Sequence, residues 1–316
     1  MTLAGCETTD NTSSPVGYAP PSHSSSRSKH FLPDIDEVWD FSEPADSEAT
    51  FRDLLPAARQ SENEEYLYQL LTQIARAQGM QRRFVSAHST LDGVEARLSP
   101  STPVAQVRYQ LERGRVFNSS GSPERAQPLF LEAWETAKKI RAHVYAVDAA
   151  HMLAIVVSAS SLEWNEKALA YAETSGDDRA LRWRGRLYNN MGWTWHESRQ
   201  FNKALSMFRK DFVFRVESKD EDGARIAKWS MARTLRSLER FEEALDMQRD
   251  LALEFEQLGQ VDGYVHEELG ELLLLQGQRA PAKEQFGRAY DALSQDANFV
   301  AENRTRLQRI RRLGAR

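Results

Sequence analysis

Cysteine and long hydrophobic runs are the two features that this chain most clearly lacks. Cys6 is the single cysteine in 316 residues, so an internal disulfide framework and a multi-thiol metal site are both excluded. The longest apolar run, Met152–Val157, is far shorter than the roughly 20 residues that a membrane-crossing helix needs. We therefore predict no transmembrane segment.

Catalytic and cofactor-binding motifs are missing as well. The chain contains neither a glycine-rich phosphate loop nor a Gly-x-Ser-x-Gly nucleophile turn. Its seven histidines are not paired at ligand spacing on one predicted helix, and His266-Glu267-Glu268 lacks the second histidine of a zinc-binding helix. The sequence thus predicts a protein without catalytic residues, metal or cofactor, and not an enzyme.

The net charge of −5 is unevenly distributed. Residues 1–64 carry 12 acidic and 4 basic side chains, whereas residues 65–316 carry 34 acidic and 37 basic ones. The acidity therefore belongs to the N-terminal segment, and the rest of the chain is close to neutral. Because nucleic-acid binding needs a basic surface, we predict no nucleic-acid partner.

Small residues recur through the chain at a nearly constant interval. The stretch from Arg182 to Asp250 shows the unit: apolar residues spaced three and four apart, a polar turn, and a second run of this kind. The small residue near the middle of each first run returns every 38 to 40 residues, at Ala75, Gly114, Ala154, Gly192, Ala232 and Gly270. In five of the six cases an alanine follows twelve residues later, at Ala87, Ala126, Ala204, Ala244 and Ala282. Small residues let two helix backbones cross closely, so the pattern predicts six stacked helical hairpins.

This pattern resembles the tetratricopeptide repeat, in the roughly 40-residue form found in bacterial proteins. Gly192 with Trp195 in the first run, and Ala204 with Phe208 in the second, match the signature of the family. The resemblance covers about residues 62–294. It implies an all-α, right-handed α-solenoid and a scaffold that binds other proteins.

Composition and repeat together predict the domain organisation. Residues 1–30 are rich in serine and proline and poor in large apolar residues, so we expect a disordered tail. Residues 31–61 predict an N-terminal helical cap, and residues 295–316 predict a capping helix, because the last repeat of a stack needs a cover for its apolar flank. In the third hairpin Glu166 stands in the place of the alanine and Ala168 follows, which predicts an altered turn. The six expected hairpins are 62–79 with 81–98, 103–119 with 122–139, 142–158 with 162–175, 177–198 with 200–216, 219–238 with 240–258, and 260–276 with 279–294.

The first helices of such repeats line an inner groove, which is the candidate binding site. Arginine there offers two parallel donors to a carboxylate, and tryptophan adds a large contact area. The candidate peptide-binding residues are Arg76, Arg108, Arg115, His151, Arg186, Asn189, Asn190, Trp193, His196, Trp229, Arg233 and Arg236. The alternative is that the indoles pack between repeats and the arginines form ion pairs within the chain. The sixth repeat reverses the charge with Glu267, Glu268 and Glu271, so the predicted groove is bipolar.

These features favour a non-catalytic scaffold or adaptor that holds a peptide or partner segment, with acidic residues, in the groove. Two alternatives stay open. One is a sensor of a small signalling peptide, as in bacterial regulators built on about 40-residue repeats; those carry an effector domain, for which residues 1–60 are too short and too acidic. The other is a membrane-anchored lipoprotein that assembles envelope components.

The lipoprotein alternative depends on the sequence around Cys6. Leu3-Ala4-Gly5-Cys6 is similar to the lipobox of bacterial lipoproteins, in which the cysteine is lipidated. Only two residues precede this box, whereas a signal peptide begins with a basic and then an apolar region. As it stands the chain predicts a cytoplasmic protein, and a true start upstream of Met1 would make it lipid-anchored.

Overall fold

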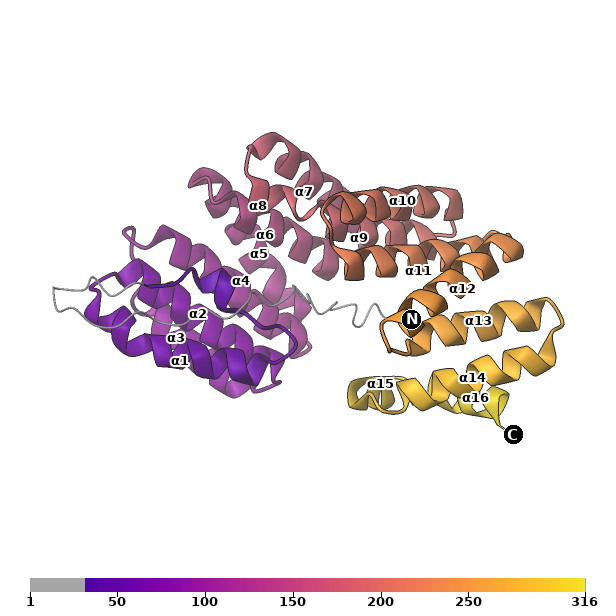
Figure 1. Ribbon diagram of the computed structural model, residues 1–316. Coiled ribbons are helices and arrows are strands. Elements are labelled where there is room, and N and C mark those ends of the chain that lie inside the picture. The colour runs from indigo at the N-terminus through magenta and orange to yellow at the C-terminus, as the bar shows by residue number, and fades with distance from the viewer. Residues whose placement is uncertain (1–31, 316) are drawn as a thin grey trace, which may run out of the picture. The chain divides into compact units, whose positions relative to one another are not determined.

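The computed structural model describes residues 32–315, and every regular element within that range is a helix (Figure 1). The Ser/Pro-rich tail and Cys6 lie outside the described residues. The chain divides into two compact units, Met1–Trp183 (unit 1) and Arg184–Arg316 (unit 2). Each unit is considered by itself below.

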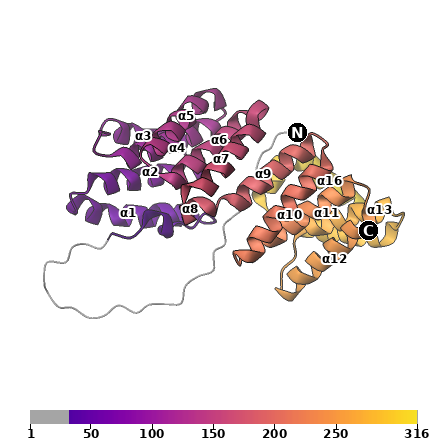
Figure 2. The same cartoon turned by 90° about the horizontal axis from the view of Figure 1, so that it is seen from above.

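Unit 1 is a row of antiparallel helices preceded by a short 3-10 turn. Sequential helices pack on one another, and the first helices of neighbouring hairpins, α2 with α4, are also in contact. Figure 2 shows the row from above. The elements are η1 (Ile35–Val38), α1 (Pro44–Gln60), α2 (Glu64–Met80), α3 (Phe84–Glu95), α4 (Pro103–Ser119), α5 (Pro123–Lys139), α6 (His143–Val156), η2 (Ser158–Ser160), α7 (Ser161–Ser175) and α8 (Asp178–Leu181).

Unit 2 continues with three hairpins and two C-terminal helices. Each helix packs on the next through α14, and α16 packs back on α14. The elements are α9 (Arg184–Glu197), α10 (Phe201–Glu217), α11 (Glu221–Ser237), α12 (Phe241–Gln257), α13 (Gly263–Leu275), α14 (Arg279–Leu293), α15 (Ala297–Glu302) and α16 (Arg304–Gly314).

The recurring small residues lie where the two helices of a hairpin cross. A Cβ added to Gly114 would lie 2.5 Å from the ring of Phe130, and one added to Gly270 would lie 2.9 Å from the ring of Phe286. The rings of Phe130 and Phe286 are fully buried. Gly192 has the same relation to the ring of Phe208. The interpretation of these residues as close-contact points between helices is confirmed.

Most of the longer helices are followed by a residue in the left-handed region, which turns the chain back for the next helix. At the end of α11, for example, Glu239 has φ 60°, and the backbone N–H groups of Glu239 and Arg240 donate to the carbonyls of Arg236 and Leu235. These bonds satisfy the last carbonyls of the helix. Glycine fills this position in some turns, but Glu62, Arg82, Arg141, Arg199, Lys219 and Glu239 fill it in others.

The structure differs from the sequence-based expectation in the fourth hairpin. Its first helix, expected as one run over 177–198, is broken into α8 and α9. The side chain of Asp177 caps α8, and the break at Arg182 and Trp183 coincides with the division between the units. The predicted irregular turn in the third hairpin is present as η2.

The C-terminal run, expected as one capping helix over 295–316, also differs, because it forms two helices, α15 and α16, between Ala297 and Gly314. Phe299 and Ile310 are both buried in the same hydrophobic cluster. Eleven residues of straight helix would separate them by about 16 Å along the axis. The break at Asn303 lets both side chains reach the cluster.

Within residues 32–315 no single helix is long and apolar enough to cross a membrane. One pair, His143–Val156 with Ser158–Ser175, passes that test of length and composition only when taken together, and the pair is bent by 118°.

Candidate functional site

In unit 1 the predicted groove arginines form an ion-pair network with carboxylates of the chain. Arg115 on α4 lies 2.7 Å from Glu112 and 2.5 Å from Asp148 of α6. Arg76 on α2 lies 3.5 Å from the same Glu112 oxygen. Burial alone would raise the pKa of Asp148, but Arg115 and Arg76 bring it below the usual range. His151 lies on α6, with its ring centroid 5.3 Å from that of Trp183.

Arg108, the remaining groove arginine of unit 1, pairs with the N-terminal segment. Its guanidinium lies 2.7 Å from Asp36 Oδ1, and Arg179 of α8 also pairs with Asp36. The hydroxyl of Tyr145 on α6 accepts a hydrogen bond from Arg108 at 2.6 Å and donates one to Asp36 Oδ2 at 3.2 Å. Three helices thus supply donors to one carboxylate.

The protonation states of this cluster follow from its burial and charges. Burial acts to raise the pKa of Asp36, but Arg108 and Arg179 outweigh it and lower that pKa, so Asp36 stays ionised. Burial raises the pKa of Tyr145 to about 12, so its hydroxyl keeps the proton that it donates. The cluster is therefore built to hold an anionic group.

Aromatic residues of the same segment cover α2. The Trp39 indole N–H donates to Gln73 Oε1 at 2.9 Å, and the ring stacks on Phe41 with centroids 4.7 Å apart. The guanidinium of Arg76 lies 5.1 Å from the Phe41 ring centroid and 5.7 Å from that of Trp39. The sequence analysis missed these partners, and the available signal was an acidic and aromatic segment, Asp34 to Phe41, in the part of the chain with excess negative charge.

In unit 2 the first helices of the hairpins and the C-terminal helix α15 carry a ladder of four aromatic rings. Trp193 on α9, Trp229 on α11, Tyr264 on α13 and Phe299 on α15 follow one another with ring centroids 6.0, 6.3 and 5.6 Å apart. The Trp229 indole N–H donates to the Tyr264 carbonyl at 3.3 Å. Tyr264 is 38% exposed, whereas Phe299 is buried. Only the two tryptophans were predicted, although the four residues recur every 35 or 36 positions.

Charged side chains flank this ladder. Arg236 makes two hydrogen bonds to the carboxylate of Glu268, and Arg233 lies 3.8 Å from it. The C-terminal helix α16 neutralises the other acidic residues of α13, because Arg306 pairs with Glu267 and Arg309 pairs with Glu271. The arginines and glutamates beside the rings thus form a mixed band of charge, to which the predicted groove residues Arg233 and Arg236 belong.

The remaining candidates lie on α9. His196 accepts or donates a hydrogen bond at 3.0 Å with Ser237 Oγ, and burial together with Arg233 and Arg236 lowers its pKa to about 4, so the ring is neutral at pH 7. Arg186 and Asn190 are partly buried and have interaction partners within the chain. Asn189 Oδ1 is buried and has no hydrogen-bond partner among the described residues.

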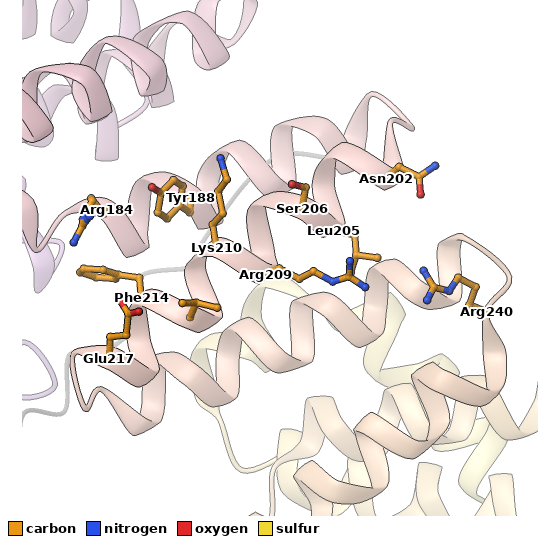
Figure 3. A pocket seen from close by; sticks show the side chains of 11 residues that line it. Arg184, Tyr188, Asn202, Leu205, Ser206, Arg209, Lys210, Phe214, Glu217 and Arg240 are labelled. Atoms are coloured by element: carbon orange, nitrogen blue, oxygen red, sulfur yellow. The ribbon is translucent and has the colours of Figure 1, made fainter.

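A surface pocket of about 540 Å³ lies on α9 and α10 (Figure 3). Its lining residues are Arg184, Tyr188, Asn202, Leu205, Ser206, Arg209, Lys210, Val213, Phe214, Glu217 and Arg240. Figure 3 shows Arg184 beside Phe214 at one end, where the guanidinium lies 4.9 Å from the ring centroid, and Arg240 at the other end. The pocket shares no residue with the aromatic ladder. Within residues 32–315 no group of three or more His, Cys, Asp or Glu side chains is placed to hold a metal ion.

No family model matches this chain, and a comparison with curated proteins gives no match. Several solved structures do resemble it. The apo form of RapI superposes with a TM-score of 0.64 at 12% identity, over 87% of this chain and 84% of RapI. NprR in complex with its cognate peptide NprX gives a TM-score of 0.56 at 14% identity, over 88% of this chain and 81% of NprR.

A third similar structure is a signal-transduction ATPase with a tetratricopeptide-repeat sensor from Pyrococcus horikoshii. Its TM-score is 0.63 at 13% identity; the match covers 88% of this chain but only 44% of that protein. Identities this low establish the fold alone. The chain therefore has the helical-hairpin fold of tetratricopeptide-repeat proteins, as the spacing of its small residues predicted.

Proposed function

We propose that the chain is a non-catalytic interaction scaffold and that the inner helices of unit 2 hold a peptide or a segment of a partner protein. The observation that carries the proposal is the aromatic ladder of Trp193, Trp229, Tyr264 and Phe299. Its tryptophans are partly buried and Tyr264 is exposed, so a partner lying across them would remove aromatic surface from water. Large aromatic side chains of this kind dominate the energy of many interfaces.

The charges beside the ladder favour a partner with acidic residues. Five arginines, four of which pair with the glutamates of α13, stand beside three glutamates. The band therefore contains two more arginines than glutamates. Such an excess steers an acidic segment towards the ladder and raises its association rate. The five arginines are Arg186, Arg233, Arg236, Arg306 and Arg309.

A random twelve-residue peptide library displayed on phage tests the proposal. We expect enriched peptides to contain aspartate or glutamate and to bind the wild-type chain. The double variant Arg186→Glu/Arg233→Glu reverses two charges beside the ladder, and we expect it to bind these peptides at least tenfold more weakly. The matched control, Arg209→Glu/Arg249→Glu, makes the same charge change at exposed positions of α10 and α12 and should bind like wild type. If the two double variants bind the peptides with equal affinity, the proposal that the ladder face is the binding site is refuted.

The peptide-bound NprR structure favours a more specific form of this function, a sensor of a small signalling peptide. A sensor must change conformation when it binds, whereas a static adaptor need not. Small-angle scattering of the chain with and without a library-derived peptide separates the two, because only a sensor would show a change in radius of gyration.

A further inference from the structure

Residues 34–41 cross the first helices of unit 1 as an extra, non-repeat segment. Figure 1 shows this indigo stretch, which precedes α1, running over α2. Asp36 is held by donors from α4, α6 and α8, and Trp39 and Phe41 lie against Gln73 and Arg76 of α2. The segment therefore reaches four successive first helices, α2, α4, α6 and α8.

The contacts of this segment are those of a bound peptide. Its only helical part is the four-residue turn η1, and its polar contacts to the first helices are made mainly by the side chains of Asp36 and Trp39. The donors to Asp36, at Arg108, Tyr145 and Arg179, are 37 and 34 residues apart, so they come from consecutive repeats. A short segment with one acidic anchor (Asp36), one aromatic anchor (Trp39) and one buried aliphatic residue (Ile35) thus occupies a surface built from repeating units.

The inner face of unit 1 requires an anion at this position. The Arg108 side chain is only 5% exposed, and a buried cation without a partner is strongly unfavourable. Asp36 and Arg179 are more open, with side chains 30% and 46% exposed. A second carboxylate can therefore approach the cluster from solvent and compete with Asp36.

We propose that the inner face of unit 1 is a second peptide-binding site, selective for a carboxylate followed three residues later by an aromatic residue, and that residues 34–41 fill it as a tethered internal ligand. A partner peptide of the same chemistry binds by displacing them. The inference concerns unit 1 alone and stands whether or not unit 2 binds a partner.

The test uses the full chain and a fluorescent synthetic peptide with the sequence of residues 32–42. In the wild-type chain the tethered segment competes at a high effective concentration, so we expect weak binding of the added peptide. The variant Asp36→Asn/Trp39→Ala weakens the tethered segment, and it should bind the peptide at least tenfold more tightly than wild type. The matched control is Glu37→Gln, which changes an exposed carboxylate in the same turn and should bind like wild type.

Peptide variants test the selectivity. Changing the peptide residue that corresponds to Asp36 to asparagine should weaken binding to the double-variant chain at least tenfold, and changing the residue that corresponds to Glu37 to glutamine should not. If the double variant does not fold, as judged by circular dichroism, the single variant Asp36→Asn takes its place.

Four results would overturn the proposal. One is a folded variant that binds the peptide no better than wild type. Another is equal binding of the Asp36-matched peptide and its asparagine form. The third is failure of both variants to fold, which would make the segment an integral part of the core rather than a ligand. A dimer in which copies exchange the segment, detected by light scattering, would likewise refute an internal ligand.

Discussion

Replacing Gly114 by alanine tests the packing rule that the hairpins share. Gly114 on α4 faces Phe130 on α5, and an added Cβ would lie 2.5 Å from Cε1 and 2.8 Å from Cζ of the ring. Phe130 is fully buried, so its ring has no open space to enter. The substitution therefore forces the ring or one of the two helices to shift.

The expected loss follows from two opposing effects. Alanine is a better helix former than glycine by about 1 kcal/mol. Extra atoms in a well-packed core cost about 1–3 kcal/mol, and a 2.5 Å approach to a buried ring belongs at the upper end of that range. We expect Gly114→Ala to lower the free energy of unfolding by about 2 kcal/mol. Adding Phe130→Leu should recover about half of this, because the chain already pairs Ala75 with Leu91 at the same spacing.

Urea unfolding followed by circular dichroism measures these changes. The matched control is Gly93→Ala on α3, where the nearest atom would be 3.6 Å from the new Cβ, so only the gain in helix propensity of up to about 1 kcal/mol should appear. Gly270→Ala should fall between them, since its Cβ would lie 2.9 Å from the ring. If Gly114→Ala proves as stable as Gly93→Ala, close contact is not the reason for the glycine.

Three further substitutions address pH and the turns. His196 is neutral in the folded chain with its pKa lowered to about 4 from 6.5, so the unfolded chain binds more protons between these values and stability is lost as the pH falls from 6.5 to about 4. Allowing for partial exposure, this loss is about 1–2 kcal/mol; His196→Gln should remove that part of the pH dependence, and an unchanged profile of unfolding free energy against pH would contradict the assignment. Glu239 occupies the left-handed region at φ 60°, so Glu239→Gly should raise the free energy of unfolding by about 1 kcal/mol, and Gly259→Ala at the equivalent position after α12 should lower it by a similar amount. Opposite signs in thermal melts of these two variants are the expected result, and a stabilising Gly259→Ala would refute the backbone argument.

The repeat itself was predictable because its cause is local and recurs. Wherever Phe130, Phe208 or Phe286 crosses the first helix of its hairpin, only glycine leaves enough space, and glycine stands there each time. Where the partner is Leu91 or Gln248, alanine suffices and is fully buried. This packing constraint applies once in each hairpin, so a small residue recurs in the sequence once every 38 to 40 residues.

The partners of the groove arginines were not predictable in the same way. Arg108 pairs with Asp36, which lies 72 residues earlier and belongs to no repeat. Arg306 reaches Glu267 only because the C-terminal run breaks at Asn303 and α16 packs back on α14. Residue types and periodicity placed the groove arginines on the first helices, but the pairs that Arg108 and the C-terminal Arg306 form depend on non-repeating segments at the two ends of the repeat region.

The charged residues on the first helices find their ion-pair partners in different ways in the two units. This difference determines which interactions each unit can make with a partner. In unit 1 the buried Arg108 depends on Asp36, a residue of the non-repeat segment that competing carboxylates can replace. In unit 2 Glu268 is held by arginines of the preceding hairpin, and Glu267 is held by α16, which packs on the core through Ile310. Those pairs are parts of the fold, so a partner of unit 2 gains less from exchanging charges than from covering the exposed aromatic surface. For the proposed function, aromatic burial would set the affinity of such a partner, and the larger number of arginines than glutamates would raise its rate of association.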